Sequence, residues 1–197
     1  MIPVHVRSRT ASVVLALAGM LLALAAATGT ASASSNAATG TATRSSSTAS
    51  THPDFSAQAT SLGLTSAQAK TLQVQVNGYL SKLGGTQVAI NKINLNDKGY
   101  VLFPLPGKKA AAANFCNLYY FCAYSQPDFN GIAINMYACS LYSIPFKGTG
   151  SWANNQTKGT QARMYDTTGK LIYTTPGAYS GATSGDWTPV TSVRNCP

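Results

Sequence analysis

The residues with the clearest chemistry are four cysteines, all in the C-terminal part of the chain: Cys116, Cys122, Cys139 and Cys196. Cysteines form disulfides or bind zinc, and the two uses require different spacings. Structural zinc sites use Cys-x-x-Cys pairs with further cysteines or histidines. This region has no such pair, and the two histidines of the chain, His5 and His52, lie outside it. We therefore predict two disulfides and no metal site. Four cysteines allow three pairings, among which the sequence does not choose.

The same region lacks the side chains that hydrolytic catalysis requires. A nucleophile needs an adjacent base, and glycoside hydrolysis needs a pair of carboxyl groups. Residues 114–197 contain no His and no Glu. Their aspartates, Asp128, Asp166 and Asp186, stand in turn sequences, where an Asp side chain commonly bonds its own backbone. We expect a protein that is not an enzyme, with no catalytic residue and no cofactor.

Inhibition of a protease requires only a rigid, exposed segment that fits the protease cleft. Rigidity lowers the entropic cost of binding, and a disulfide supplies it. The segment after Cys139 carries large apolar side chains in a loop-like context and contains Pro145. The alternative is that these side chains belong to a core strand. The candidates for an inhibitory loop are Cys139, Ser140, Leu141, Tyr142, Ile144 and Phe146.

The N-terminal segment has the parts of a secretory signal peptide in the usual order. Arg7 and Arg9 precede an apolar run at residues 13–27, and Ala-Ser-Ala follows at residues 31–33 as a cleavage site. The apolar run is shorter than the roughly 20 residues that a membrane span needs. We predict that residues 1–33 are a signal peptide and that the mature protein is secreted without a membrane anchor.

Residues 34–61 are predicted to be a disordered linker. Most of this stretch consists of Ser, Thr, Ala, Gly and Asn, which bury too little apolar surface to offset the entropy of ordering. Order is expected to begin near residue 62.

Residues 62–106 have the pattern of a small α+β module, a helix followed by a β-hairpin. Thr65 and Gln68 match a capping box, and a glycine pair at residues 84–85 is a helix stop. Apolar residues recur at helical spacing between them: Leu72, Val76, Tyr79 and Leu83. Strands are predicted at residues 86–95 and 100–105, joined by a turn.

Residues 107–113 read as a linker to the C-terminal domain. They contain the dibasic pair Lys108-Lys109 followed by alanines. Cleavage at this pair by an extracellular protease would make the preceding module a pro-segment, and the alternative is an uncut linker.

Residues 114–197 are predicted to form a disulfide-bonded all-β domain. Aromatic residues are dense, turn sequences recur at short intervals, and no stretch has helical periodicity. Short strands with this turn spacing favour a sandwich or a barrel.

One segment of this domain has the spacing aromatic-x-x-x-x-aromatic-x-Gly, formed by Tyr124, Phe129 and Gly131. Two such aromatic rings can stack across a bent hairpin, and the glycine permits the turn. The segment resembles the folded hairpin of the βγ-crystallin Greek-key motif. Asn154 and Asn155 match the loop before the fourth strand of that motif. Ser192 matches the closing strand of a second, degenerate copy.

Within that superfamily, this region resembles an exported, cysteine-containing group, the peptidase inhibitors of the Streptomyces metalloproteinase inhibitor family. The resemblance implies a double Greek-key sandwich and inhibition of an extracellular metalloprotease. Crystallin-like domains often bind calcium, but neither copy of the motif here supplies a carboxylate at the ligand positions, and calcium prefers several carboxylates. We therefore expect no metal ligand.

The charge balance suggests a second function class. The chain has 14 Lys and Arg against five acidic residues, a net charge of +9, and most of the excess lies before residue 114. Such a field attracts anionic polymers, although it also serves solubility alone. The alternative function is a cell-wall or antimicrobial binding module similar to the killer-toxin-like proteins that share the crystallin-type fold, with Tyr119, Tyr120 and Tyr142 stacking on sugars. We expect a monomer with no specific nucleic-acid partner.

Overall fold

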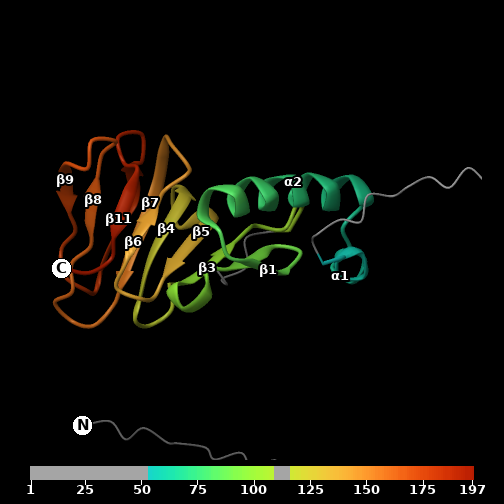
Figure 1. The fold of residues 1–197 in the computed structure, drawn as a ribbon, viewed down its shortest axis with the longest axis horizontal. Coiled ribbons are helices and arrows are strands. Elements are labelled where there is room, and N and C mark those ends of the chain that lie inside the picture. The colour runs from blue at the N-terminus through green and yellow to red at the C-terminus, as the bar shows by residue number, and fades with distance from the viewer. Residues whose placement is uncertain (1–52, 109–115) are drawn as a thin grey trace, which may run out of the picture. The chain divides into compact units, whose positions relative to one another are not determined.

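The computed structural model describes residues 53–108 and 116–197 (Figure 1). The predicted signal peptide, both histidines and Lys109 lie outside the described residues. The described residues belong to one compact unit. Among them, no helix is both long enough and apolar enough to span a membrane.

The main helix, α2, spans Ser66–Leu83 and has the predicted boundaries. The Thr65 hydroxyl accepts a hydrogen bond from the backbone N–H of Gln68, and the Gln68 side chain accepts one from the backbone N–H of Thr65. The helix ends at Gly84 and Gly85, whose φ values of 69° and 94° lie in the left-handed region that glycine tolerates. The capping-box prediction is therefore confirmed.

A shorter helix, α1, spans Ser56–Ser61, where the sequence predicted a disordered linker. Ala59 is buried in the hydrophobic core, and Phe55 packs against the same core. The Gln58 side chain accepts a hydrogen bond from the backbone N–H of Ile90. The prediction of disorder is wrong for these residues because they dock on the segment after α2. The rest of the predicted linker lies outside the described residues, except for residues 53–55.

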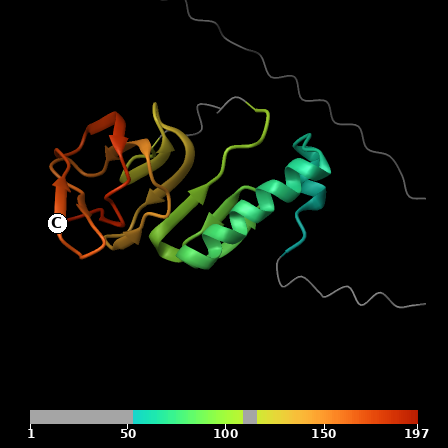
Figure 2. The same cartoon turned by 90° about the horizontal axis from the view of Figure 1, so that it is seen from above.

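The segment after α2 contains three short strands: β1 (Thr86–Ala89), β2 (Lys92–Asn94) and β3 (Gly99–Leu102). A 3-10 turn, η1 (Asn96–Lys98), joins β2 to β3. The predicted single strand over residues 86–95 is thus a hairpin with a turn at Ile90 and Asn91. Asn91 stabilises that turn, because its side chain donates a hydrogen bond to the Phe103 carbonyl. Helix α2 covers one face of these strands (Figure 2).

Strand β3 pairs antiparallel with β5 (Asn130–Met136), so the hairpin continues the C-terminal sheet. The register places Gly99 opposite Met136 and Val101 opposite Ile134. The resulting seven-stranded sheet has the order β1-β2-β3-β5-β4-β7-β10, in which β4 spans Tyr120–Gln126, β7 spans Thr149–Asn155 and β10 spans Ser180–Asp186. The predicted module and the predicted domain therefore share backbone hydrogen bonds in a single sheet.

The C-terminal region is built from eight antiparallel strands, which confirms the prediction of a β-rich fold. The strands are β4 (Tyr120–Gln126), β5 (Asn130–Met136), β6 (Leu141–Ser143), β7 (Thr149–Asn155), β8 (Arg163–Tyr165), β9 (Leu171–Thr174), β10 (Ser180–Asp186) and β11 (Ser192–Arg194).

The eight strands fall into two successive groups of four that exchange their third strands. Strand β6, the third of the first group, lies in the four-stranded sheet of order β6-β11-β8-β9. Strand β10, the third of the second group, lies at the edge of the seven-stranded sheet. One hydrophobic core contains side chains of both sheets and of α2.

Trp187, just after β10, connects the two groups within this core. It is 2% exposed, and its indole N–H donates a 3.0 Å hydrogen bond to the Tyr124 carbonyl of β4. Gly150 of β7 allows this approach, because a Cβ at Gly150 would overlap both the Tyr124 carbonyl oxygen and the Trp187 indole.

Replacing Gly150 with Ala should therefore lower the free energy of unfolding by about 2 kcal/mol or more, because the indole must move out of a close-packed core. Gly78→Ala is the matched control. Gly78 lies exposed in α2 with open space at its Cβ position, so the change should raise stability by roughly 0.5–1 kcal/mol. Urea unfolding monitored by circular dichroism measures both. Equal stability of Gly150→Ala and the wild type would contradict this packing.

Candidate functional site

The disulfides pair Cys116 with Cys122 and Cys139 with Cys196. The second bridge joins residues 57 apart in sequence, and it continues the register of the β6–β11 pair, in which Leu141 lies opposite Arg194. The bridge therefore closes one end of that strand pair. This fixes the backbone at the start of the segment that the sequence singled out for inhibition.

Within that segment only Leu141–Ser143 form a strand, β6, and most of the large apolar side chains are buried. Tyr142, Ile144 and Phe146 are only 5%, 3% and 8% exposed, whereas Leu141 is 53% exposed. Burial contradicts the prediction that Tyr142, Ile144 and Phe146 belong to an exposed inhibitory loop, and it agrees with the alternative that these side chains belong to the core. Phe146, for example, packs edge-to-face against Trp187, with 5.5 Å between ring centroids. Of the candidates, Cys139, Ser140 and Leu141 remain at or near the surface.

Hydrogen bonds hold both sides of Leu141. The backbone N–H of Ser140 donates to the side-chain oxygen of Asn195, which is fully buried. The Tyr142 hydroxyl lies 2.6 Å from the Lys98 carbonyl oxygen and 2.7 Å from the Ala138 carbonyl oxygen, to which it donates. Leu141 is thus an exposed apolar side chain on an immobilised backbone.

The folded hairpin forms around the residues predicted from sequence. The rings of Tyr124 and Phe129 meet edge-to-face at 5.6 Å, and Gly131 has a φ of 79°. Ser151 of β7 closes the fold, since its hydroxyl donates to the Gln126 carbonyl and accepts from the backbone N–H of Phe129. The sequence analysis missed Ser151, whose position just before Trp152 in a strand was the available signal.

Asn154 and Asn155 lie within β7, not in a loop that precedes the fourth strand, so that prediction is wrong. The amide of Asn154 donates to the carbonyl oxygens of Thr160 and Pro176, and that of Asn155 donates to the Cys116 carbonyl. Both amides therefore brace neighbouring backbone. Ser192 lies in β11, between β6 and β8, as the closing strand of the second group.

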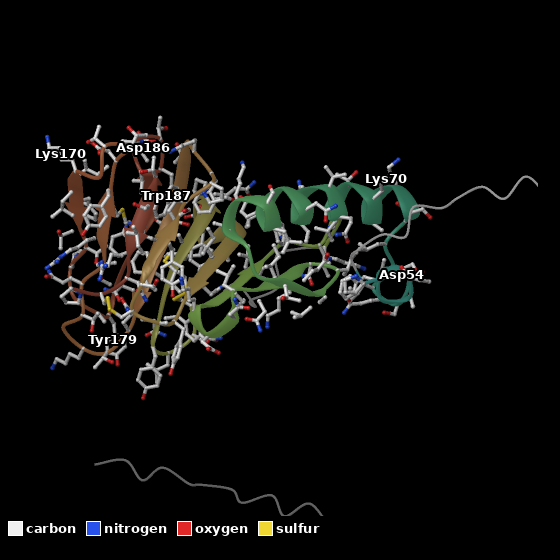
Figure 3. All side chains as sticks on the ribbon, viewed as in Figure 1. Asp54, Lys70, Lys170, Tyr179, Asp186 and Trp187 are labelled. Carbon is white, nitrogen blue, oxygen red and sulfur yellow. A yellow bond between two sulfur atoms is a disulfide. The ribbon has the colours of Figure 1, made fainter. Side chains whose placement is uncertain are left out.

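Two of the three C-terminal aspartates cap turns, as their sequence context predicted. Asp166 accepts hydrogen bonds from the backbone N–H groups of Thr168 and Lys170, and Asp186 accepts one from that of Thr188. Hydrogen bonds from Thr168 lower the pKa of Asp166, and those from Thr188 lower the pKa of Asp186. Figure 3 shows Asp186 at the end of the strands, with Trp187 further into the sandwich.

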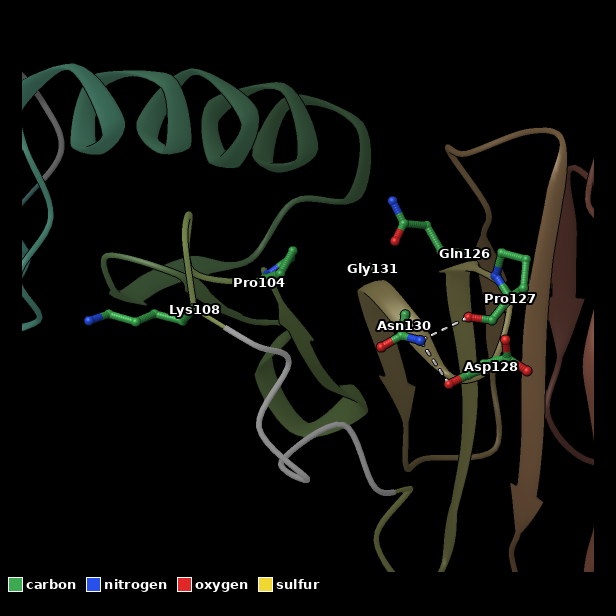
Figure 4. Close-up of a pocket in the computed structure, with 7 residues that line it drawn as sticks. All are labelled: Pro104, Lys108, Gln126, Pro127, Asp128, Asn130 and Gly131. Atoms are coloured by element: carbon green, nitrogen blue, oxygen red, sulfur yellow. Dashed lines mark hydrogen bonds between the residues drawn. The ribbon is translucent and has the colours of Figure 1, made fainter.

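A cleft of about 590 Å³ lies beside the folded hairpin (Figure 4). The Asn130 amide in this cleft donates to the carbonyls of Pro127 and Asp128, so it is taken up by its own turn. Within residues 53–108 and 116–197, no group of three or more His, Cys, Asp or Glu side chains could hold a metal ion. The lining residues of the cleft are Pro104, Lys108, Gln126, Pro127, Asp128, Asn130 and Gly131.

A row of tyrosines crosses the seven-stranded sheet. Tyr100 and Tyr120 lie 5.8 Å apart by ring centroid, Tyr120 and Tyr137 lie 5.2 Å apart, and the Lys92 ammonium lies 4.4 Å from the Tyr100 ring. Tyr137 is 54% exposed. The sequence analysis missed Tyr100 and Tyr137, because they come from different strands.

Of the three tyrosines predicted to stack on sugars, only Tyr119 is well exposed, at 55%. Tyr120 belongs to the row of tyrosines and is partly buried. Tyr142 is buried, so its predicted role in sugar stacking is wrong. Its hydroxyl is directed to backbone acceptors within the fold, the carbonyl oxygens of Lys98 and Ala138.

Comparisons with known proteins add no relative to this description. No family model, no curated protein and no solved structure matches the chain. Two surfaces carry features of a binding site, the exposed Leu141 on its hydrogen-bonded backbone and the row of tyrosines.

Tyr142→Phe tests how β6 is held. Burial raises the pKa of Tyr142 to about 12, above the value near 10 of an unfolded tyrosine. The neutral hydroxyl therefore contributes stability below pH 10 that is lost as the pH rises toward 12. The variant should lose about 1 kcal/mol of unfolding free energy at pH 7, because the hydrogen bond that the single hydroxyl hydrogen donates to a carbonyl is lost. It should also show a shallower alkaline loss in urea unfolding measured from pH 7 to 12.

Part of the alkaline loss should persist in the variant, because burial also raises the pKa of Tyr79 to about 12 and raises the pKa of Tyr124. Tyr119→Phe is the control at an exposed ring and should leave stability within about 0.5 kcal/mol of wild type. If Tyr142→Phe behaves like this control, the hydroxyl does not hold β6.

Proposed function

We propose that the protein is an exported protease inhibitor whose C-terminal region adopts the double Greek key of the βγ-crystallin-like peptidase inhibitors. The two successive groups of four antiparallel strands in two sheets are compatible with this fold. Strands β6 and β10 are the third strands that these groups exchange. Two disulfides and the predicted signal peptide are consistent with export to an oxidising compartment.

The observation that carries the proposal is the exposure of Leu141 on an edge strand held by a disulfide. Strand β6 is the edge of the four-stranded sheet, and Leu141 keeps 53% of its surface exposed although α2 also contacts β6. A protease that binds residues 139–141 in extended form would receive Leu141 in its specificity pocket. Thermolysin-type metalloproteases accept large apolar side chains of this kind.

The same bracing explains how the segment would resist its target. The backbone of residues 139–141 is already held in the free protein, so binding a protease would order few further groups and the entropic cost of binding is small. After a cut beside Leu141, the disulfide would hold the Cys139 side, and the pairing of β6 with β11 would hold the other side. The two new ends would remain together in the cleft instead of separating as products.

The wild-type protein should inhibit a thermolysin-like metalloprotease with an inhibition constant of micromolar or lower. Leu141→Glu should weaken inhibition by about 100-fold, because a carboxylate would enter an apolar pocket. Steady-state assays with a chromogenic peptide substrate measure both constants.

Leu171→Glu is the matched control, since Leu171 is 46% exposed on β9, the opposite edge of the same sheet, without a disulfide beside it. It should inhibit as the wild type does. The proposal fails if the wild type inhibits no member of a panel of metallo-, serine, cysteine and aspartic proteases. It also fails if the two variants inhibit equally.

The row of tyrosines favours a second candidate, binding of a cell-wall polymer. Pyranose rings stack on exposed aromatic faces, and Tyr137 offers more than half of its surface beside the Tyr120 ring, which in turn contacts the Tyr100 ring. The ammonium of Lys92 lies at the end of the row, where it could pair with an acidic group of the polymer.

Tyr137→Ala should reduce retention of the protein on insoluble peptidoglycan or chitin by about tenfold, because one stacking ring is lost. Sedimentation with the polymer and quantification of the unbound protein measures this. Tyr179→Ala is the control, because Tyr179 is 66% exposed but lies outside the row. Equal retention of both variants and the wild type would remove this candidate.

A further inference from the structure

A groove with a volume of about 440 Å³ opens between the edge strands of the two sheets. Strand β9 ends the four-stranded sheet, and β10 ends the seven-stranded sheet. Volumes of this size are typical of sites for small molecules. The residues that line the groove include Trp152, Met164, Tyr173, Gly185, Asp186 and Trp187.

The groove is open because β10 has small residues at positions where larger side chains would fill the space between the two sheets. Ala182 and Gly185 line it, and the register of β10 against β7 shifts between these two residues. A Cβ added at Gly185 would come no closer than 3.9 Å to Trp152. The space is therefore open and could receive a ring.

The walls of the groove are aromatic. The rings of Trp152 and Tyr173 lie 6.2 Å apart. Tyr173, which is 44% exposed, presents most of the accessible aromatic surface, whereas Trp152 and Trp187 are 6% and 2% exposed. Trp187 lines the groove next to Asp186 (Figure 3). Aromatic walls of this kind attract a planar ring and also an organic cation, through the negative faces of their π systems.

The groove also carries polar groups, among them the Trp152 indole N–H and the Asp186 carboxylate. The indole N–H of Trp187 donates to the Tyr124 carbonyl, but that of Trp152 has no hydrogen-bond acceptor in the described part of the chain. Its nitrogen would lie 4.0 Å from a Cβ at Gly185, so it faces the open space. Asp186 is the only charged side chain among the lining residues, and one of its carboxylate oxygens also accepts the Thr188 N–H.

We propose that this groove binds a small aromatic amine that carries an oxygen acceptor. The ring would lie among Trp152, Tyr173 and Trp187, the oxygen would accept the Trp152 N–H, and the ammonium would pair with the Asp186 carboxylate. This site is separate from Leu141 and from the row of tyrosines, so it does not depend on either proposed function.

The charge of the whole chain makes the ligand preference diagnostic. With a net charge of +9, the protein attracts anions in general and disfavours cations. A preference for an amine over a carboxylate of the same shape would therefore report on Asp186 rather than on the overall field.

Tyramine, phenethylamine and 4-hydroxyphenylacetate form a matched set of probes for this site. The chain has two tryptophans, and both line the groove, so their two indole N–H resonances in a nitrogen-15 NMR spectrum report on it directly. Tyramine should shift both resonances saturably, with a dissociation constant below about 1 mM. Phenethylamine lacks the hydroxyl that would accept the Trp152 N–H, so it should bind more weakly and should not move the Trp152 indole N–H resonance downfield as tyramine does. 4-Hydroxyphenylacetate should bind at least about tenfold more weakly than tyramine.

Gly185→Leu should fill the groove and weaken tyramine binding at least about tenfold. Thr183→Leu is the control, because Thr183 is an exposed residue of the same strand that does not line the groove. Asp186→Asn keeps an acceptor for the Thr188 N–H, so it should fold, yet it should lose the preference for tyramine over 4-hydroxyphenylacetate.

The absence of a saturable shift with tyramine in the wild type overturns the proposal. So does equal affinity for the amine and the carboxylate, or wild-type affinity in a folded Gly185→Leu. If Gly185→Leu does not fold, Asp186→Asn decides the question alone, since an unchanged preference for tyramine overturns the proposal and its loss supports it.

Discussion

The exchange of β6 and β10 between the two sheets is the constraint on which the remaining structure depends. Neither group of four strands can complete its own sheet, because each lends its third strand to the other. Both groups of strands therefore contribute side chains to one core. Within it, Trp187 of the second group donates a hydrogen bond to the Tyr124 carbonyl of the first. Such an arrangement favours cooperative unfolding, since loss of one sheet removes a strand from the other.

The N-terminal strands β1, β2 and β3 extend one of the two sheets, at the edge formed by β5. By pairing with β5, strand β3 covers a strand edge that would otherwise be open to association with other chains. In return, α2 and the hairpin share the core of the larger part, which a unit of their size cannot provide alone. A cut near Lys108 would therefore leave the N-terminal segment attached through the sheet.

The features that the sequence predicted well are local. The capping box of Thr65 and Gln68 and the hairpin of Tyr124, Phe129 and Gly131 each involve residues a few positions apart, whose side chains determine the backbone directly. The alternation that buries Tyr142 was also present in the sequence, but Pro145 and the nearby cysteine favoured a loop. The pairing of β3 with β5 and the groove at β10 were not predictable, because backbone pairing across long separations leaves no local pattern.

The disulfides have a consequence for the order of oxidative folding. Along the chain, Cys139 lies nearer to Cys122 than to Cys196, and closing that shorter loop would cost about 1 kcal/mol less entropy. Cys116 and Cys122 are only six residues apart, so they find each other first and withdraw Cys122 from competition. The Cys116–Cys122 bridge thus removes the nearer competing partner of Cys139. Cys139 then stays reduced until β6 and β11 pair and bring Cys196 to it.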